Sequence, residues 1–140
     1  MAKIYCNYFT DSGKIPILEE MPKTSFSILN DPDTGIRLPG ENNQKEGRTH
    51  ISVPTIANQL KNNKIKCVVT FDQSHYRKDK GNHKDQRFIK MDGIRREGFY
   101  CIYYVSHAPF LFAVPSKQLL IELKKRLKAA GVPECRFEEI

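Results

Sequence analysis

Two apolar runs, "KIKCVVTF" (64–71) and "GFYCIYYVS" (98–106), decide the fold of this chain, and a third run, "FLFAV" (110–114), follows them. β-Branched and aromatic residues dominate all three runs, which is typical of strands. Because residues 64–71 are almost continuously apolar, we expect a central strand that is buried on both faces. The short "HAP" connection (107–109) predicts an antiparallel hairpin formed by the second and third runs.

The chain before this region alternates strand-like runs with turns. Residues 54–63, "PTIANQLKNN", predict a short helix, since proline is favoured in a first helical turn and the apolar residues fall on one side. Residues 30–48 are rich in Asp, Asn, Pro and Gly and predict a long loop. Further strands are predicted by "AKIYCNYF" (2–9), "KIPIL" (14–18), "TSFSIL" (24–29) and "THISV" (49–53).

The C-terminal part of the chain contains the clearest helix, "PSKQLLIELKKRLKAAG" (115–131). Ser116 is placed to cap its first turn and Gly131 to end it. Its leucines predict a buried stripe, and "ECRFEEI" (134–140) predicts a closing strand. Residues 1–140 are therefore expected to form a single α+β domain. It would have a mixed, mostly antiparallel sheet, one short helix and one long C-terminal helix, with loops at 30–48 and 72–96.

Length and cysteine usage limit the class of protein. A chain of 140 residues is long enough to bury a core without cross-links. Its four cysteines form no CxxC pair, and three of them lie in apolar runs, which favours buried free thiols over a zinc site. With no apolar stretch of membrane-spanning length and no signal-peptide pattern, the sequence predicts a cytoplasmic protein without a membrane partner.

The net charge of +7 comes from two segments of the second half. Residues 72–96 hold eight Lys/Arg and four Asp, and residues 116–128 hold five Lys/Arg and one Glu, so that each segment has a net charge of +4. The other residues hold ten basic and eleven acidic side chains, a net of −1. Charge gathered in this way is typical of proteins that bind polyanions, although a basic surface can also serve solubility alone.

The sequence thus predicts a nucleic-acid-binding protein that uses a basic loop. Aromatic strand residues on an open sheet face offer bases a surface on which to stack, although core packing is their commoner role. By analogy alone, small basic proteins of this kind are typical of mobile elements or toxin systems. The expected nucleic-acid contacts are Arg77, Lys78, Lys80, Lys84, Arg87, Lys90, Arg95, Arg96, Lys124, Lys125 and Lys128.

Cleavage of the phosphodiester bond is a further hypothesis. Without a metal, His75 or His83 would take a proton from the attacking 2′-hydroxyl, and Lys84 or Arg87 would stabilise charge on the phosphate. If His50, His75, His83 and His107 converge, an enzyme is favoured, whereas scattered histidines favour a binding protein.

A metal-dependent nuclease is the other catalytic hypothesis. Mg²⁺ would then be held by carboxylates, for which Asp72 and Asp85 are the candidates, although no convincing Glu-x-Lys strand accompanies them. Mg²⁺ is implied by this hypothesis only. Two alternatives from other classes stay open: an interaction module or inhibitor that binds an acidic protein surface, and a protein that binds a small phosphorylated ligand.

Overall fold

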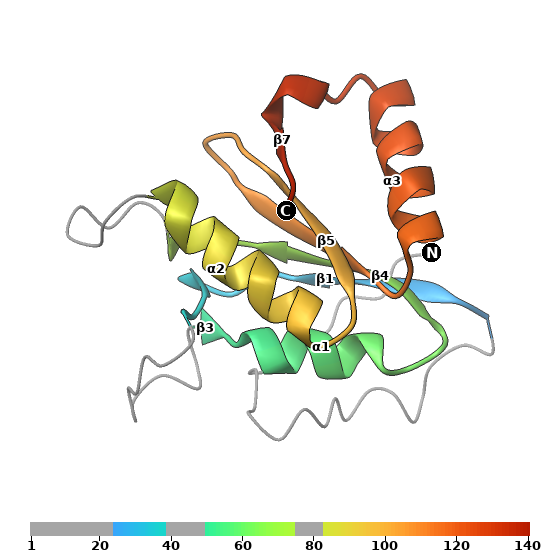
Figure 1. The fold of residues 1–140 in the computed structure, drawn as a ribbon, viewed down its shortest axis with the longest axis horizontal. Helices are drawn as coiled ribbons and strands as arrows, with labels where there is room; N and C mark the ends of the chain where they lie inside the picture. Colours follow the sequence, from blue (N-terminus) through green and yellow to red (C-terminus); the bar gives the residue numbers. More distant parts are fainter. Residues whose placement is uncertain (1–23, 39–49, 75–82) are drawn as a thin grey trace.

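The computed structural model describes residues 24–38, 50–74 and 83–140. In chain order its elements are β1 (Phe26–Asn30), β2 (Gly35–Ile36), β3 (His50–Ile51), α1 (Val53–Leu60), β4 (Ile65–Phe71), α2 (His83–Arg96), β5 (Tyr100–Tyr104), β6 (Phe110–Val114), α3 (Lys117–Ala129), a 3-10 helix (Glu134–Arg136) and β7 (Phe137–Glu138) (Figure 1).

Five strands form one mixed sheet in the order β1-β4-β6-β5-β7, and β2 and β3 pair as a separate parallel ladder. β1 and β4 are parallel, whereas β6 is antiparallel to both β4 and β5. β1, β4 and β5 therefore end at the same side of the sheet, on the left in Figure 1, which we call the carboxyl edge. In open α/β sheets this is the side at which ligands commonly bind.

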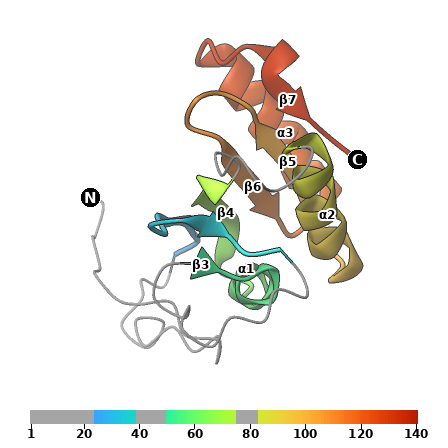
Figure 2. The ribbon, with the colours of Figure 1, turned by 90° about the vertical axis from the view of Figure 1, so that its left-hand side faces the viewer.

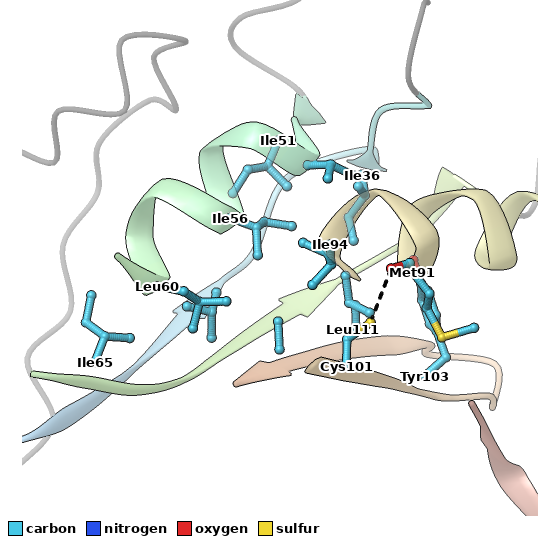
Figure 3. Close-up of a cluster of buried hydrophobic side chains, with 13 residues drawn as sticks. Ile36, Ile51, Ile56, Leu60, Ile65, Met91, Ile94, Cys101, Tyr103 and Leu111 are labelled. Carbon is cyan, nitrogen blue, oxygen red and sulfur yellow. Dashed lines mark hydrogen bonds between the residues drawn. The ribbon is translucent and has the colours of Figure 1, made fainter. Parts of the chain in front are cut away.

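Helices lie on both faces of the sheet. α1 and α2 pack against each other and cover one face, and α3 lies on the other (Figures 1 and 2). The principal hydrophobic core fills the space between the sheet and the α1–α2 layer (Figure 3). Its fully buried members include Ile36, Ile51, Ile56, Ile65, Val68, Met91, Ile94, Tyr103 and Leu111.

The structure confirms the predicted fold class, a mixed sheet in an α+β domain. The strands expected at 24–29, 64–71 and 98–106 are present, and β5 and β6 form the expected antiparallel hairpin. The short helix is α1, and β7 forms the closing strand. The strands predicted at 2–9 and 14–18 lie outside the described residues.

The prediction of one loop over residues 72–96 was wrong for its second half, because residues 83–96 form α2. Within the predicted loop at 30–48, residues 35–36 form β2. The buried positions of α2 do recur every three or four residues, as in any amphipathic helix. The buried positions are Gln86, Arg87, Lys90, Met91 and Ile94. Because Arg87 and Lys90 carry charged side chains, the sequence does not show the apolar periodicity that predicts a helix.

α3 begins and ends as its sequence predicts, but it is less buried than expected. Ser116 caps the helix, and its Oγ accepts a hydrogen bond from Leu119 N at 3.3 Å. The leucines of the predicted buried stripe are only half-buried, and no residue of α3 is fully buried. The reason is visible in Figure 1, where α3 leaves the sheet at an angle and the chain returns to it through β7.

Candidate site at the carboxyl edge

A buried carboxylate, that of Asp72, lies directly after β4 at the carboxyl edge. Its Oδ1 accepts hydrogen bonds from Ile36 N at 2.9 Å, Ser74 Oγ at 2.7 Å and Ser74 N at 3.2 Å. Its Oδ2 accepts from Lys90 Nζ at 2.7 Å and from Tyr103 OH at 2.7 Å. Four segments that are distant in the sequence thus meet at one side chain, and we call these residues the Asp72 network.

The Asp72 network contains an ion pair that is removed from water. The side chains of Asp72 and Lys90 are both 0 % exposed. Lys90 Nζ also donates to Ser74 Oγ at 2.5 Å. Transferring two charges from water to a protein interior is unfavourable unless they are paired and their other hydrogen-bonding sites are satisfied. The five hydrogen bonds to the carboxylate meet this condition.

The same contacts limit what Asp72 can do chemically. An ionised carboxylate has about four lone-pair positions, and five donors already occupy them. To bind Mg²⁺ or remove a proton from a substrate, Asp72 would have to lose the hydrogen bonds that hold Ser74, Lys90 and Tyr103. In this arrangement the geometry favours a positioning role for Asp72.

Tyr103 completes the network from β5. Its hydroxyl is buried, and burial first, with the neighbouring charge of Asp72 second, raises the pKa of Tyr103 well above its usual value. The hydroxyl therefore stays protonated and donates to Asp72 over the physiological range. Tyr104, the next residue, points to the opposite face and is half-buried, as alternation along a strand requires.

A second ion pair fastens α2 to the C-terminal strand. Arg87 donates through Nε to Glu138 Oε2 and through a terminal nitrogen to Glu138 Oε1, both at 2.7 Å. This two-pronged geometry suits the planar guanidinium group. The hydrogen bond to Glu138 raises the pKa of Arg87. α2 is thus held at the sheet through both Lys90 and Arg87.

The end of β1 is fixed by a buried amide pair. Asn30 Nδ2 donates to Gln59 Oε1 at 2.8 Å, and Gln59 Nε2 donates back to Asn30 Oδ1 at 3.0 Å. Asn30 Nδ2 also lies 3.2 Å from Thr70 Oγ1. β1, α1 and β4 are therefore joined by polar contacts immediately before the carboxyl edge.

Sequence reasoning missed several of these positioning residues. Tyr103 carried a weak signal, since two adjacent tyrosines in a strand must face opposite sides. Ser74, Asn30 and Gln59 gave none, because uncharged polar residues are common in loops and on helix surfaces.

The predicted catalytic residues do not form one cluster in the described part of the chain. His75 lies outside the described residues. His83 and Asp85 are exposed in the first turn of α2, whereas Asp72 is buried in its network. No group of three His, Cys, Asp or Glu that could hold a metal ion occurs among residues 24–38, 50–74 and 83–140.

The described histidines come from three different elements. His50 begins β3, His83 begins α2, and His107 lies between β5 and β6. His75, the fourth histidine, lies outside the described residues, so convergence of the four histidines stays a prediction.

The predicted nucleic-acid contacts fall into three groups. Arg77, Lys78 and Lys80 lie outside the described residues. Lys84, Arg95 and Lys125 are exposed, and Lys84 Nζ lies 5.7 Å from the centre of the Phe88 ring. The others form ion pairs, namely Arg87 with Glu138, Lys90 with Asp72, Arg96 with Asp92, Lys124 with Glu139 and Lys128 with Glu134.

These pairs change the expected contact surface. Lys90 is fully buried, so it cannot reach a phosphate as the sequence predicted. Arg87 is almost as inaccessible, since its side chain is 10 % exposed. Both residues instead position α2. The remaining ion pairs involve exposed side chains, which are weakly held and can exchange an acidic partner for a phosphate.

The buried thiols predict a loss of stability at alkaline pH. Burial raises the pKa of Cys67 to about 11 and that of Cys101 to about 12. Above pH 9 the unfolded chain releases these protons while the folded protein keeps them, so the free energy of unfolding falls as pH rises. The slope approaches about 1.4 kcal/mol per pH unit for each ionising thiol. Tyr103 acts in the same direction above pH 10.

Urea unfolding at pH 7, 9, 10 and 11 in the presence of a reductant measures this dependence. Cys101→Ala should give a shallower decline than the natural protein between pH 9 and 11. An equally steep decline in the variant would show that the Cys101 thiol is not the source.

The fold and the site together define an α+β domain whose carboxyl edge is organised by a buried Asp–Lys–Tyr network. No protein-family model, no curated protein and no solved structure matches the chain. Within the described ranges, no helix has the length and apolar character needed to cross a membrane.

Proposed function

We propose that the protein binds the phosphate backbone of nucleic acid with residues 75–82, the basic stretch between Ser74 at the carboxyl edge and the start of α2. The observation that carries this proposal is the Asp72 network. It fixes Ser74, the residue directly before the stretch, to Lys90 in the helix directly after it. The start of the stretch and the helix that follows its end are thereby fixed to the same carboxylate at the edge of a rigid sheet, where binding residues are commonly found.

Charge at this place supports the proposal. Residues 75–84 contain Arg77, Lys78, Lys80 and Lys84 against the single acid Asp79, a net charge of +3. Lys84 is exposed on the first turn of α2, at the helix end that carries partial positive charge. Fixing the ends of a binding segment in advance also reduces the entropy that is lost when it orders on a ligand.

Binding is the function that these observations favour over cleavage. Asp72 is saturated by hydrogen bonds, which argues against its role in the metal-dependent hypothesis. A metal-free nuclease that uses His75 or His83 remains a hypothesis, and so do Asp85 as a ligand and an acidic protein as the partner. We further propose a cytoplasmic location, which the free buried thiols of Cys67 and Cys101 support, because disulfides are rare in reducing compartments.

The salt dependence of binding tests this proposal. We expect a fluorescein-labelled duplex to bind with log K falling linearly as log salt rises, with a slope of roughly −0.9 for each phosphate contacted. Replacing Arg77, Lys78 and Lys80 by Gln should reduce the slope by about 2 to 3 and weaken binding by at least tenfold at low salt. Fluorescence anisotropy at several NaCl concentrations measures both quantities.

A matched control removes the same charge elsewhere. Lys64, Lys66 and Lys117 are exposed, and Lys64 and Lys117 lie at the opposite edge of the sheet, before β4 and after β6. The triple Gln variant at these positions should keep the slope of the natural protein. Equal losses in the two triple variants would show a nonspecific effect of net charge. A flat salt response would rule out phosphate binding.

A further inference from the structure

One row of the sheet consists of aromatic residues in four neighbouring strands. Phe71 of β4 is in register with Phe110 of β6, Phe110 with Tyr104 of β5, and Tyr104 with Phe137 of β7. The ring centres of Phe71 and Phe110 are 5.2 Å apart, and those of Tyr104 and Phe137 are 5.8 Å apart. We call these four residues the aromatic row. All four are half-buried.

The aromatic row lies at the carboxyl edge on the face away from α1 and α2. Phe71 and Tyr104 are the last residues of their strands, and Phe110 is the first residue of β6. Phe71 immediately precedes Asp72, so the row begins where the chain turns into the Asp72 network and the basic stretch. The row and Ser74, from which the basic stretch starts, thus lie at the same edge of the sheet.

This face is apolar and incompletely covered by the described residues. By alternation along each strand, every second side chain faces α1 and α2, and the side chains that share a face with the aromatic row include Leu29, Val69, Ile102 and Phe112, which carry no charge. In the next row, Ile102 is fully buried near α3, Phe112 and Val69 are half-buried, and Leu29 is 68 % exposed. Coverage therefore decreases steadily from β5 to β1.

We propose that the aromatic row is a stacking platform for the bases of single-stranded nucleic acid. This inference rests on the proposed function and deepens it, since it names the class of nucleic acid. Bases stack on aromatic side chains without sequence preference, whereas paired bases inside a duplex are not accessible for such contacts. The uncharged side chains of the row suit bases, and the basic stretch that follows Ser74 suits their phosphates.

The dimensions of the row define a ligand length. Four neighbouring strands place its ends about 14 Å apart, at roughly 4.8 Å per strand. If each ring takes one base on its face, the row accommodates at most four bases. Phe110 is central, because it lies in register with both Phe71 and Tyr104. It is therefore the residue whose loss should weaken stacking most.

Two strands with identical phosphates separate stacking from phosphate binding. The full chain is titrated into fluorescein-labelled dT8 and into an eight-residue abasic strand, with rU8 as a second arm that distinguishes RNA from DNA. We expect dT8 or rU8 to bind at least tenfold more tightly than the abasic strand at equal salt. A 2-aminopurine placed at the centre of the octamer should lose fluorescence on binding, as it does when it stacks.

Phe110→Leu keeps the apolar character of the position and removes the ring. It should weaken dT8 binding about tenfold and leave binding of the abasic strand unchanged. Phe99→Leu is the matched control, because Phe99 is also half-buried but packs against the core on the other face. It should change neither affinity. Tyr104→Leu repeats the test if Phe110→Leu does not fold, as judged by its urea unfolding curve.

The outcomes distinguish this inference from the function on which it rests. Equal affinity for dT8, rU8 and the abasic strand would overturn the platform while phosphate binding stands. Absence of binding to all three strands would overturn the proposed function itself, and the platform with it. Selective loss of dT8 or rU8 binding in Phe110→Leu supports both.

Discussion

Asp72→Asn is expected to lower the free energy of unfolding by about 3–5 kcal/mol, one of the two largest effects that we predict. Asparagine nearly preserves the shape of the side chain but removes its charge. Lys90 would then be left 0 % exposed without its counter-ion, and the hydrogen bond from Tyr103 would lose its charged acceptor. Urea unfolding at pH 7, followed by circular dichroism, measures the change.

The double variant Asp72→Asn/Lys90→Met provides the control. Replacing both members of a buried ion pair by uncharged side chains is often close to neutral, whereas removing one member is not. The double variant should therefore be more stable than Asp72→Asn alone, which gives a coupling energy from the mutant cycle. If Asp72→Asn unfolds at the same urea concentration as the natural protein, the ion pair does not stabilise the fold.

Gly35→Ala is expected to destabilise the protein by roughly 3–4 kcal/mol through two separate causes. Gly35 has φ +97°, a conformation that costs a residue with a side chain about 1–2 kcal/mol. An added Cβ would also lie 2.2 Å from Asp72 Oδ1 and 2.7 Å from Gln73 N. Because neither atom belongs to a flexible side-chain end with room to move, the Asp72 network must shift.

Gly98 separates the two causes. It has φ +87°, but a Cβ built on it meets nothing within 4 Å. Gly98→Ala should therefore show only the conformational cost of about 1–2 kcal/mol. The difference between the two variants in urea unfolding reports the contact with Asp72. If both variants lost the same free energy of unfolding, moving β2 away from Asp72 would cost no stability.

Asp72→Asn and Gly35→Ala also bear on function, because both disturb the Asp72 network, which holds Ser74 at the start of the basic stretch. Ser74 is held by Asp72 and Lys90, so any variant that breaks these contacts leaves the stretch attached at less defined points. On the proposed function, folded Gly35→Ala protein should bind nucleic acid more weakly with an unchanged salt slope, since no phosphate contact is removed. This separates positioning of the stretch from its charge.

Much of the fold followed from local patterns in the sequence. Period-2 and continuous apolar runs marked β4, β5 and β6, and the proline and amphipathic spacing after residue 53 marked α1. Ser116 and Gly131 marked the ends of α3. Each of these signals depends on a few consecutive residues, whose preferences act before any tertiary contact forms.

α2 was missed because its buried face contains Arg87 and Lys90. A charged side chain can be buried at an inward position only when an oppositely charged group pairs with it. The partners of Arg87 and Lys90 are Glu138 and Asp72, which come from distant parts of the chain. The same reasoning explains why Lys90 was assigned to a phosphate-binding surface. From the sequence, a buried lysine and an exposed one look alike.

The sequence by itself determined the α+β class, most strand and helix positions, and the gathering of positive charge in the second half of the chain. Only the tertiary structure decided which charges are exposed, that Asp72 joins Ser74, Lys90 and Tyr103, and that four aromatic residues align across β4, β6, β5 and β7. Strand and helix preferences act over a few residues, whereas burial of an ion pair and strand register depend on contacts between residues far apart in the chain.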